Sequence, residues 1–276
     1  MLIAAFRATL IAFCLLLAGA WAPAAAQTAV DLQLVLAVDA SGSVSEQRFE
    51  LQKQGYVAAF RSPLLLRAVR TGARQAIAVT MMQWTGPALQ VEVVPWRLID
   101  SEASMLAFAA AIAAGPRQLF GGGTSISGAI DHAMTLFPKS QYVGARRVID
   151  ISGDGRNNRG RPAPDARDEA VRAGVTINGL PILAIELDLE EFYRDNVIGG
   201  PGAFVIPAFS FETFADAILK KLVIEISELR GRPMLPLPIL LRNGEREQLA
   251  RALVAAPHPS PLPMKYGERE PVAASR

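Results

Sequence analysis

The most constraining feature of this sequence is an apolar run that ends abruptly in a polar loop. Leu34 to Val38 are all apolar, and Asp39, Ser41 and Ser43 follow at alternate positions. A continuous run of this kind predicts a strand buried on both faces, as in a parallel sheet. Ligand sites of open α/β sheets lie at the carboxyl ends of such strands. The loop is therefore a candidate site.

Two interpretations of this loop are open. Ser43 and Glu46 have the spacing of a capping box, so Ser43 would cap a helix that carries Phe49, Tyr56 and Phe60 on one face. Alternatively, the carboxylate of Asp39 and the two serine hydroxyls offer three oxygen ligands to a hard cation such as magnesium.

A second and a third loop offer the same kind of group. Thr124 follows the three glycines 121–123 and opens an expected helix from Ile126 to Phe137, so it is either an N-cap or a ligand. The glycine run lacks the motifs of a P-loop or a dinucleotide site. Asp154 lies between two glycines after an expected buried strand, Arg147 to Ser152. It is either a turn residue or a second carboxylate at a strand end.

The remaining pattern alternates strands with helices, which predicts an α/β fold: a doubly wound, mostly parallel sheet with helices on both faces. Leu89–Ile99 would form an antiparallel edge strand, because it follows a turn at Thr85–Pro87 and contains Pro95. The other expected strands are Gln75–Trp84, Val175–Leu187 and Ala203–Phe209, and the other expected helices are Glu102–Ala114, Asp165–Ala173 and Phe211–Leu229. We expect residues 192–202 to form an irregular loop.

With these loops in order, the sequence resembles the von Willebrand factor type A domain. That family carries a metal ion-dependent adhesion site with an Asp-x-Ser-x-Ser motif, a threonine and an aspartate. The resemblance implies that one divalent cation is held by the residues Asp39, Ser41, Ser43, Thr124 and Asp154. Tyr193 to Phe204 further resembles an exported bacterial subgroup that is described only as a domain of unknown function.

The chain departs from the family pattern at one position beside the site. Gly153 stands where these domains usually have a threonine. We place Gly122, Gly123, Asn157 and Asn158 at the rim of the site, although the two asparagines also fit a solvated loop.

The N-terminus has the pattern of a signal peptide over residues 1–26. Arg7 precedes an apolar stretch, and an Ala-x-Ala site suggests cleavage between Ala26 and Gln27, with export to the periplasm or beyond. The only cysteine, Cys14, lies in this segment. We expect a domain over 27–229 and a proline-rich, disordered tail over 230–276. The net charge of +2 argues against nucleic acid as a partner, and we expect no stable membrane span after cleavage.

The resemblance implies a module that binds metal without being an enzyme. Its cation would be Mg2+, with Mn2+ or Ca2+ as alternatives, and a protein partner would supply an Asp or Glu to the cation. One alternative is a metal-dependent hydrolase, but position 41 is serine, and His132 is the one histidine in the expected domain. Another is a structural domain that has kept the loops and binds no metal.

Overall fold

The computed structural model describes residues 27–227. The expected signal peptide and tail lie outside the described residues. The strands are β1 (Thr28–Asp39), β2 (Ile77–Trp84), β3 (Gln90–Ile99), β4 (Tyr142–Gly153) and β5 (Thr176–Pro181). The helices are α2 (Glu46–Ala59), α3 (Pro63–Val69), α4 (Glu102–Ala114), α5 (Ile126–Leu136), α6 (Ala163–Arg172), α7 (Leu189–Asn196) and α8 (Phe214–Ile226), with a short 3-10 turn at Phe137–Lys139.

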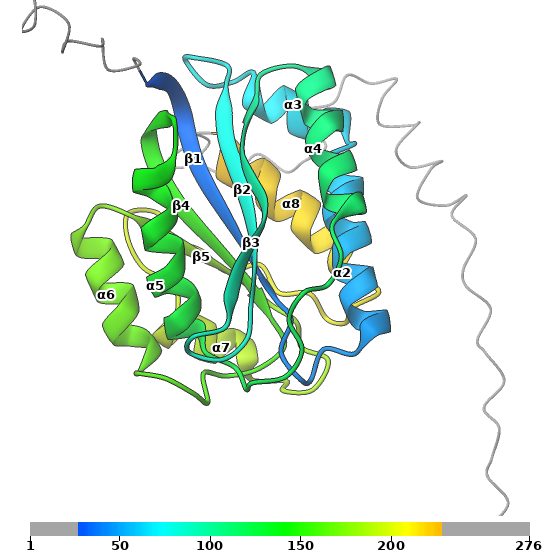
Figure 1. The fold of residues 1–276 in the computed structure, drawn as a ribbon, viewed down its shortest axis with the longest axis vertical. Helices are drawn as coiled ribbons and strands as arrows, with labels where there is room; N and C mark the ends of the chain where they lie inside the picture. Colours follow the sequence, from blue (N-terminus) through cyan, green and yellow to red (C-terminus); the bar gives the residue numbers. More distant parts are fainter. Residues whose placement is uncertain (1–26, 228–276) are drawn as a thin grey trace, which may run out of the picture. The chain divides into compact units, whose positions relative to one another are not determined.

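The strands form one mixed sheet in the order β3-β2-β1-β4-β5 (Figure 1). β1 is parallel to β2 and β4, β4 is parallel to β5, and β3 is the antiparallel edge strand. The expected α/β fold with one antiparallel edge is thus confirmed. Asp39 pairs with Trp84 of β2, and Val38 pairs with Ser152 of β4. The loops that follow β1 and β4, which carry expected metal ligands, therefore lie at the same edge of the sheet.

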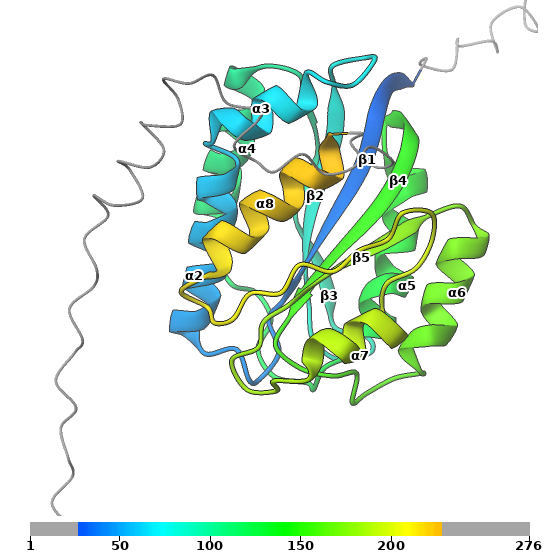
Figure 2. The same cartoon turned by 180° about the vertical axis from the view of Figure 1, so that it is seen from behind.

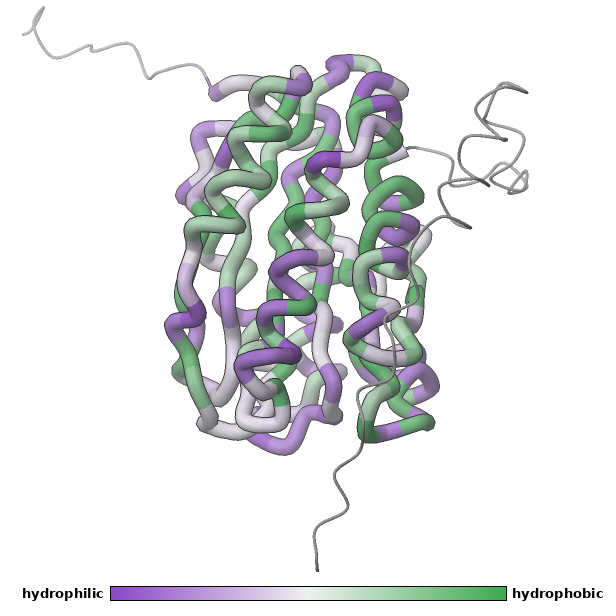
Figure 3. Tube along the Cα trace, turned by 90° about the vertical axis from the view of Figure 1, so that its right-hand side faces the viewer, coloured by the Kyte–Doolittle hydropathy of each residue, from purple (hydrophilic) through white to green (hydrophobic). Residues whose placement is uncertain are grey.

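Helices cover both faces of the sheet. Alternate side chains of β1 point to opposite cores: Leu34, Leu36 and Val38 pack in one core, and Val35 and Ala37 in the other. The first core lies under α2, α3, α4 and α8, and the second lies under α5, α6 and α7, as Figures 1 and 2 show from the two sides. Figure 3 shows the matching alternation of hydrophilic and hydrophobic residues along the helices. No helix in residues 27–227 is long and apolar enough to span a bilayer.

The expectations for the last third of the domain were wrong in three places. β5 ends at Pro181, not at Leu187. Residues 189–196 form α7, although residues 192–196 were expected in a loop. The expected strand Ala203–Phe209 makes isolated bridges at Val205 and Ala208 and no continuous ladder. The reason is that Pro207 has no N–H to donate, while the N–H of Phe204 donates to the Asn178 side chain at 3.0 Å.

A buried charged cluster joins α8 to the sheet. Nζ of Lys221 lies 2.6 Å from Oδ1 of Asp150 on β4 and 3.1 Å from Oε2 of Glu225. Nδ2 of Asn178 on β5 donates to Oε1 of Glu225 at 2.6 Å. All four residues are fully buried. The single ammonium of Lys221 is thus shared by two carboxylates, and burial raises the pKa of Asp150 to about 7. These contacts fix one face of α8 against β4 and β5.

Candidate metal centre

The loop after β1 is shaped by the Asp39 side chain. Oδ1 of Asp39 accepts the backbone N–H of Ser41 at 2.7 Å, which turns the chain directly after the strand. The helix α2 then begins at Glu46, and Ser45 caps it by accepting the N–H of Arg48 at 3.3 Å. The interpretation of Ser43 as the cap of this helix, which was one of the two left open, was therefore wrong. Because Ser45 caps the helix, the Ser43 hydroxyl is available to the site.

Ser43 connects the first loop to the third. Its hydroxyl donates to Oδ1 of Asp154 at 2.6 Å and lies 3.2 Å from the Ser41 hydroxyl. Oδ2 of Asp39 accepts the backbone N–H of Asp154 at 3.4 Å. Two carboxylates and two hydroxyls, from segments more than 100 residues apart in sequence, therefore meet at the carboxyl edge of the sheet.

The glycine loop brings Thr124 beside these groups. Gly121, Gly122 and Gly123 all have positive φ, between 73° and 92°, a region that side-chain-bearing residues rarely adopt. The Thr124 hydroxyl lies 3.8 Å from the position that a Cβ at Gly155 would occupy, directly after Asp154. Ser125, not Thr124, caps α5, because its hydroxyl accepts the N–H of Gly128 at 3.1 Å.

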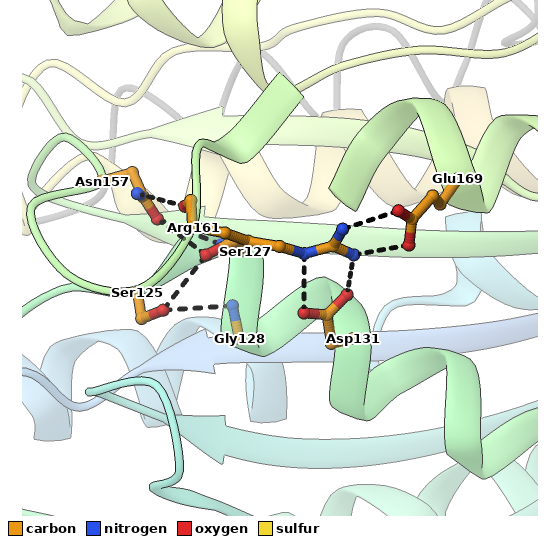
Figure 4. Close-up of polar contacts among 7 residues, drawn as sticks. All are labelled: Ser125, Ser127, Gly128, Asp131, Asn157, Arg161 and Glu169. Atoms are coloured by element: carbon orange, nitrogen blue, oxygen red, sulfur yellow. Dashed lines mark hydrogen bonds and ion pairs between the residues drawn. The ribbon is translucent and has the colours of Figure 1, made fainter. Parts of the chain in front are cut away.

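The two rim asparagines hold this loop through its backbone. Oδ1 of Asn158 accepts the N–H of Thr124 at 2.9 Å, and Oδ1 of Asn157 accepts the N–H of Ser127 at 3.1 Å. Asn157 also donates to the carbonyl of Arg161, whose guanidinium bridges Asp131 and Glu169 (Figure 4). Both asparagine side chains thus bind the start of α5 and so hold Thr124 in place.

Burial raises the pKa of both carboxylates. Burial, and secondly the negative charge of Asp154, raise the pKa of Asp39 to about 7, against the hydrogen bonds from Ser41 and Asp154 that lower it. Burial also raises the pKa of Asp154, against the opposing effects of the Ser43 hydrogen bond and the Arg48 charge. The ionised pair is therefore under-stabilised by the protein groups around it, and a nearby cation would favour the charged forms.

The residues at this edge fit a hard divalent cation. Oδ2 of Asp154 is buried and has no hydrogen-bond partner among the described residues, although it forms a long ion pair with Nη1 of Arg48 at 3.7 Å. An unsatisfied carboxylate oxygen of this kind is costly unless something binds it. Three hydroxyls and two carboxylates are oxygen donors, which Mg2+ prefers. Residues 27–227 contain no cluster of three or more His, Cys, Asp or Glu residues that could hold a metal, so a cation here would need the hydroxyls as ligands.

Sequence reasoning missed three side chains that adjoin the site. Arg48 of α2 donates to the Ser43 carbonyl at 2.9 Å, and Arg117 donates to the Ala40 carbonyl at 2.9 Å. Oε1 of Glu186, after β5, lies 3.7 Å from the Cβ position of Gly155. None carries a local signal, because each reaches the site from a different element.

The fold and the oxygen-lined edge define a von Willebrand factor type A-like domain. The chain belongs to the family described as "Protein of unknown function (DUF1194)", whose model matches residues 29–230. No curated protein sequence matches the chain significantly.

Solved structures agree with this fold. A von Willebrand factor type A structure from Catenulispora acidiphila is 16% identical, with a TM-score of 0.51 over 71% of this chain and 43% of that one. The pilus adhesin SpaC from Lactobacillus rhamnosus GG is 14% identical, with a TM-score of 0.52 over 73% of this chain and 30% of that one. The present chain thus spans less than half the length of these structures, and the likeness shows the fold alone.

Proposed function

We propose that this domain is an exported, divalent-cation-binding module that binds a protein partner through a carboxylate placed on the cation. The cation would be Mg2+ first, with Mn2+ or Ca2+ as alternatives. The observation that carries the proposal is the buried Oδ2 of Asp154, which accepts no hydrogen bond from the described residues and lies beside Asp39 and three hydroxyls. Asp39, Ser41, Ser43, Thr124 and Asp154 would hold the cation, directly or through water. When bound, the cation would attract an anionic group from outside.

The kind of partner is indicated by the surface around this edge. Three apolar side chains are exposed on loops: Phe120, between α4 and α5, is 67% exposed, Leu187, after β5, 84%, and Phe209, before α8, 74%. Surface apolar residues that gather beside a polar site favour a protein partner over a small anion. The partner segment would present an Asp or Glu with apolar neighbours.

A hydrolase is less well supported by the described residues. His132 on α5 lies next to Asp131 in sequence, but the Asp131 carboxylate binds Arg161 at 2.5 Å. Burial lowers the pKa of His132. Its backbone carbonyl accepts a hydrogen bond from the Thr135 hydroxyl. This arrangement lacks the oriented histidine of a nucleophilic triad.

The test is a selection of random peptides displayed on phage against the purified protein, with Mg2+ or with EDTA. We expect enrichment of peptides with Asp or Glu next to apolar residues, in Mg2+ alone, and no enrichment by the Asp39→Ala variant. Peptides without an acidic residue, or binding that survives EDTA, would contradict the metal-bridged carboxylate. No enrichment, with no metal binding, would favour the structural alternative.

Two matched variants test the surface. Leu187→Ser should weaken binding of the selected peptides. Val143→Ser should not, because Val143 is 47% exposed but lies near the amino end of β4.

Export is tested separately, by the N-terminal sequence of the protein recovered from the periplasm; we expect it to begin at Gln27.

A further inference from the structure

Tyr193 reaches from α7 to the candidate metal centre through space left by two glycines. Its side chain is fully buried. A Cβ at Gly179 on β5 would lie 2.6 Å from Cδ1 of the Tyr193 ring, and a Cβ at Gly153 on β4 would lie 2.9 Å from its hydroxyl. Any side chain at either position would collide with the tyrosine. The absence of a side chain at Gly179 and at Gly153 therefore leaves room for the ring and for the hydroxyl of Tyr193.

The same space borders Asp39. Oδ2 of Asp39 also lies 2.9 Å from the Cβ position of Gly153, and Cζ2 of Trp84 lies 3.2 Å from it. The Tyr193 hydroxyl has no hydrogen-bond partner among the described residues. The hydrogen bond that Oδ2 of Asp39 accepts from the Asp154 N–H is long, at 3.4 Å. A buried donor without an acceptor and an acceptor with room for another donor thus border the same space beside Gly153.

We propose that Tyr193 is a positioning residue of the metal centre, whose hydroxyl donates to Oδ2 of Asp39 through one water molecule and orients that carboxylate toward the cation. This inference rests on the proposed metal-binding function. Outer hydrogen bonds to metal-binding carboxylates fix their orientation, and their loss commonly weakens metal binding by about 10–100-fold. Burial and the neighbouring Asp39 and Asp154 carboxylates raise the pKa of Tyr193, so the phenol keeps the proton that it donates.

The proposal also gives a physical reason for Gly153. In the von Willebrand factor type A pattern a threonine usually stands at this position, beside the last aspartate. Here a threonine would overlap the Tyr193 hydroxyl, Oδ2 of Asp39 and Trp84. The Tyr193 hydroxyl, from a helix 40 residues further along the chain, thus occupies space that a side chain at position 153 would need.

The test compares Tyr193→Phe with Tyr56→Phe in the purified protein. Tyr56 is an equally buried tyrosine in the core on the opposite face of the sheet from Tyr193. Its hydroxyl has a hydrogen-bond partner, the Ser152 hydroxyl at 3.2 Å. Mn2+ affinity is measured by electron paramagnetic resonance of the free ion, and the melting temperature is measured in EDTA. We expect Tyr193→Phe to weaken Mn2+ binding by about tenfold or more and to leave the metal-free melting temperature unchanged or raised.

We expect the reverse for Tyr56→Phe, namely a lower melting temperature and unchanged Mn2+ affinity. Equal Mn2+ affinity in Tyr193→Phe and wild type would overturn the positioning role and leave the metal site intact. Absence of Mn2+ binding by the wild type would instead overturn the proposed function and this inference with it.

A spectroscopic signal keeps the test decisive if Tyr193→Phe fails to fold. Addition of Mg2+ should change the near-ultraviolet absorption of a buried tyrosine in the wild type and in Tyr56→Phe. A flat difference spectrum in a wild-type protein that binds Mg2+ would overturn the proposal. The same signal in a folded Tyr193→Phe variant would also overturn it.

Discussion

The Ser43 hydroxyl donates to the Asp154 carboxylate over 2.6 Å, although the two residues are 111 positions apart in sequence. The bond joins the loop after β1 to the loop after β4, at neighbouring strand ends. The other oxygen of Asp154 accepts no hydrogen bond from the described residues. This hydrogen bond between Ser43 and Asp154 distinguishes an organised site from two separate turns. We therefore expect specific effects of metal, of pH and of substitutions on the stability of the domain.

Removing the Asp39 carboxylate should abolish stabilisation by metal. A cation at one hundred times its dissociation constant adds about 2.7 kcal/mol to the unfolding free energy, which raises the melting temperature of a domain this size by roughly 5–10 °C. We expect this rise in the wild type and none in Asp39→Ala, by thermal unfolding in Mg2+ against EDTA.

Ser45→Ala is the matched control for Asp39→Ala. Ser45 lies in the same loop, and its hydroxyl caps α2. Its loss should lower stability by about 1 kcal/mol and leave the metal-dependent rise intact. A rise that persists in Asp39→Ala would place the cation elsewhere.

The stability of the metal-free protein should depend on pH through Asp39. Its pKa is raised to about 7 in the folded state, so the folded protein retains a proton that the unfolded chain has released. This contribution is fully present below the unfolded pKa, near about 4, and is lost as the pH rises toward about 7. Urea unfolding in EDTA should show wild type losing stability relative to Asp39→Asn between about pH 5 and about pH 7.

Metal binding should have the opposite pH dependence, because the cation must displace the proton from Asp39. Mn2+ affinity of the wild type should increase by about tenfold per pH unit below about pH 7. The raised pKa of Asp39 would be contradicted if the stability of the wild type and of Asp39→Asn changed equally with pH. It would also be contradicted if the Mn2+ affinity of the wild type did not change with pH.

Gly153 should tolerate no side chain, whereas Gly155 should. A Cβ at Gly153 would lie 2.9 Å from Oδ2 of Asp39 and 3.2 Å from Trp84, but a Cβ at Gly155 would meet ordinary contacts of 3.7 and 3.8 Å. Gly153→Ala should therefore cost about 1–3 kcal/mol of unfolding free energy, and Gly155→Ala less than about 0.5 kcal/mol. Urea unfolding of both variants in EDTA measures the difference, and equal values would show that the space beside Asp39 is not filled.

Lys221 should be essential to the packing of α8. Lys221→Met leaves Asp150 and Glu225 buried without their cation, which should cost about 3–5 kcal/mol. Lys220→Met, one residue earlier and exposed, should change stability by less than about 0.5 kcal/mol. Chemical unfolding of the two variants provides the comparison, and a small effect of Lys221→Met would mean that Asp150 and Glu225 are already neutral.

Local chemistry allowed much of the site edge to be predicted. The apolar run before Asp39 and the glycines before Thr124 fix strand ends and loop shapes through short-range effects, so the order of oxygen-bearing residues was readable without coordinates. The spacing of Leu189, Phe192 and Tyr193 is helical, and it could have revealed α7.

The amino-acid sequence alone determined the α/β class, the antiparallel edge strand and which residues could supply oxygens, because these depend on periodicity and residue chemistry near each position. Only the tertiary structure decided that Ser45 rather than Ser43 caps α2, and that Ser43 binds Asp154. It likewise decided that Tyr193 enters the space beside Gly153. The physical reason is that strand register and helix packing bring distant segments together, and no local pattern encodes which side chain will meet an unpartnered atom there.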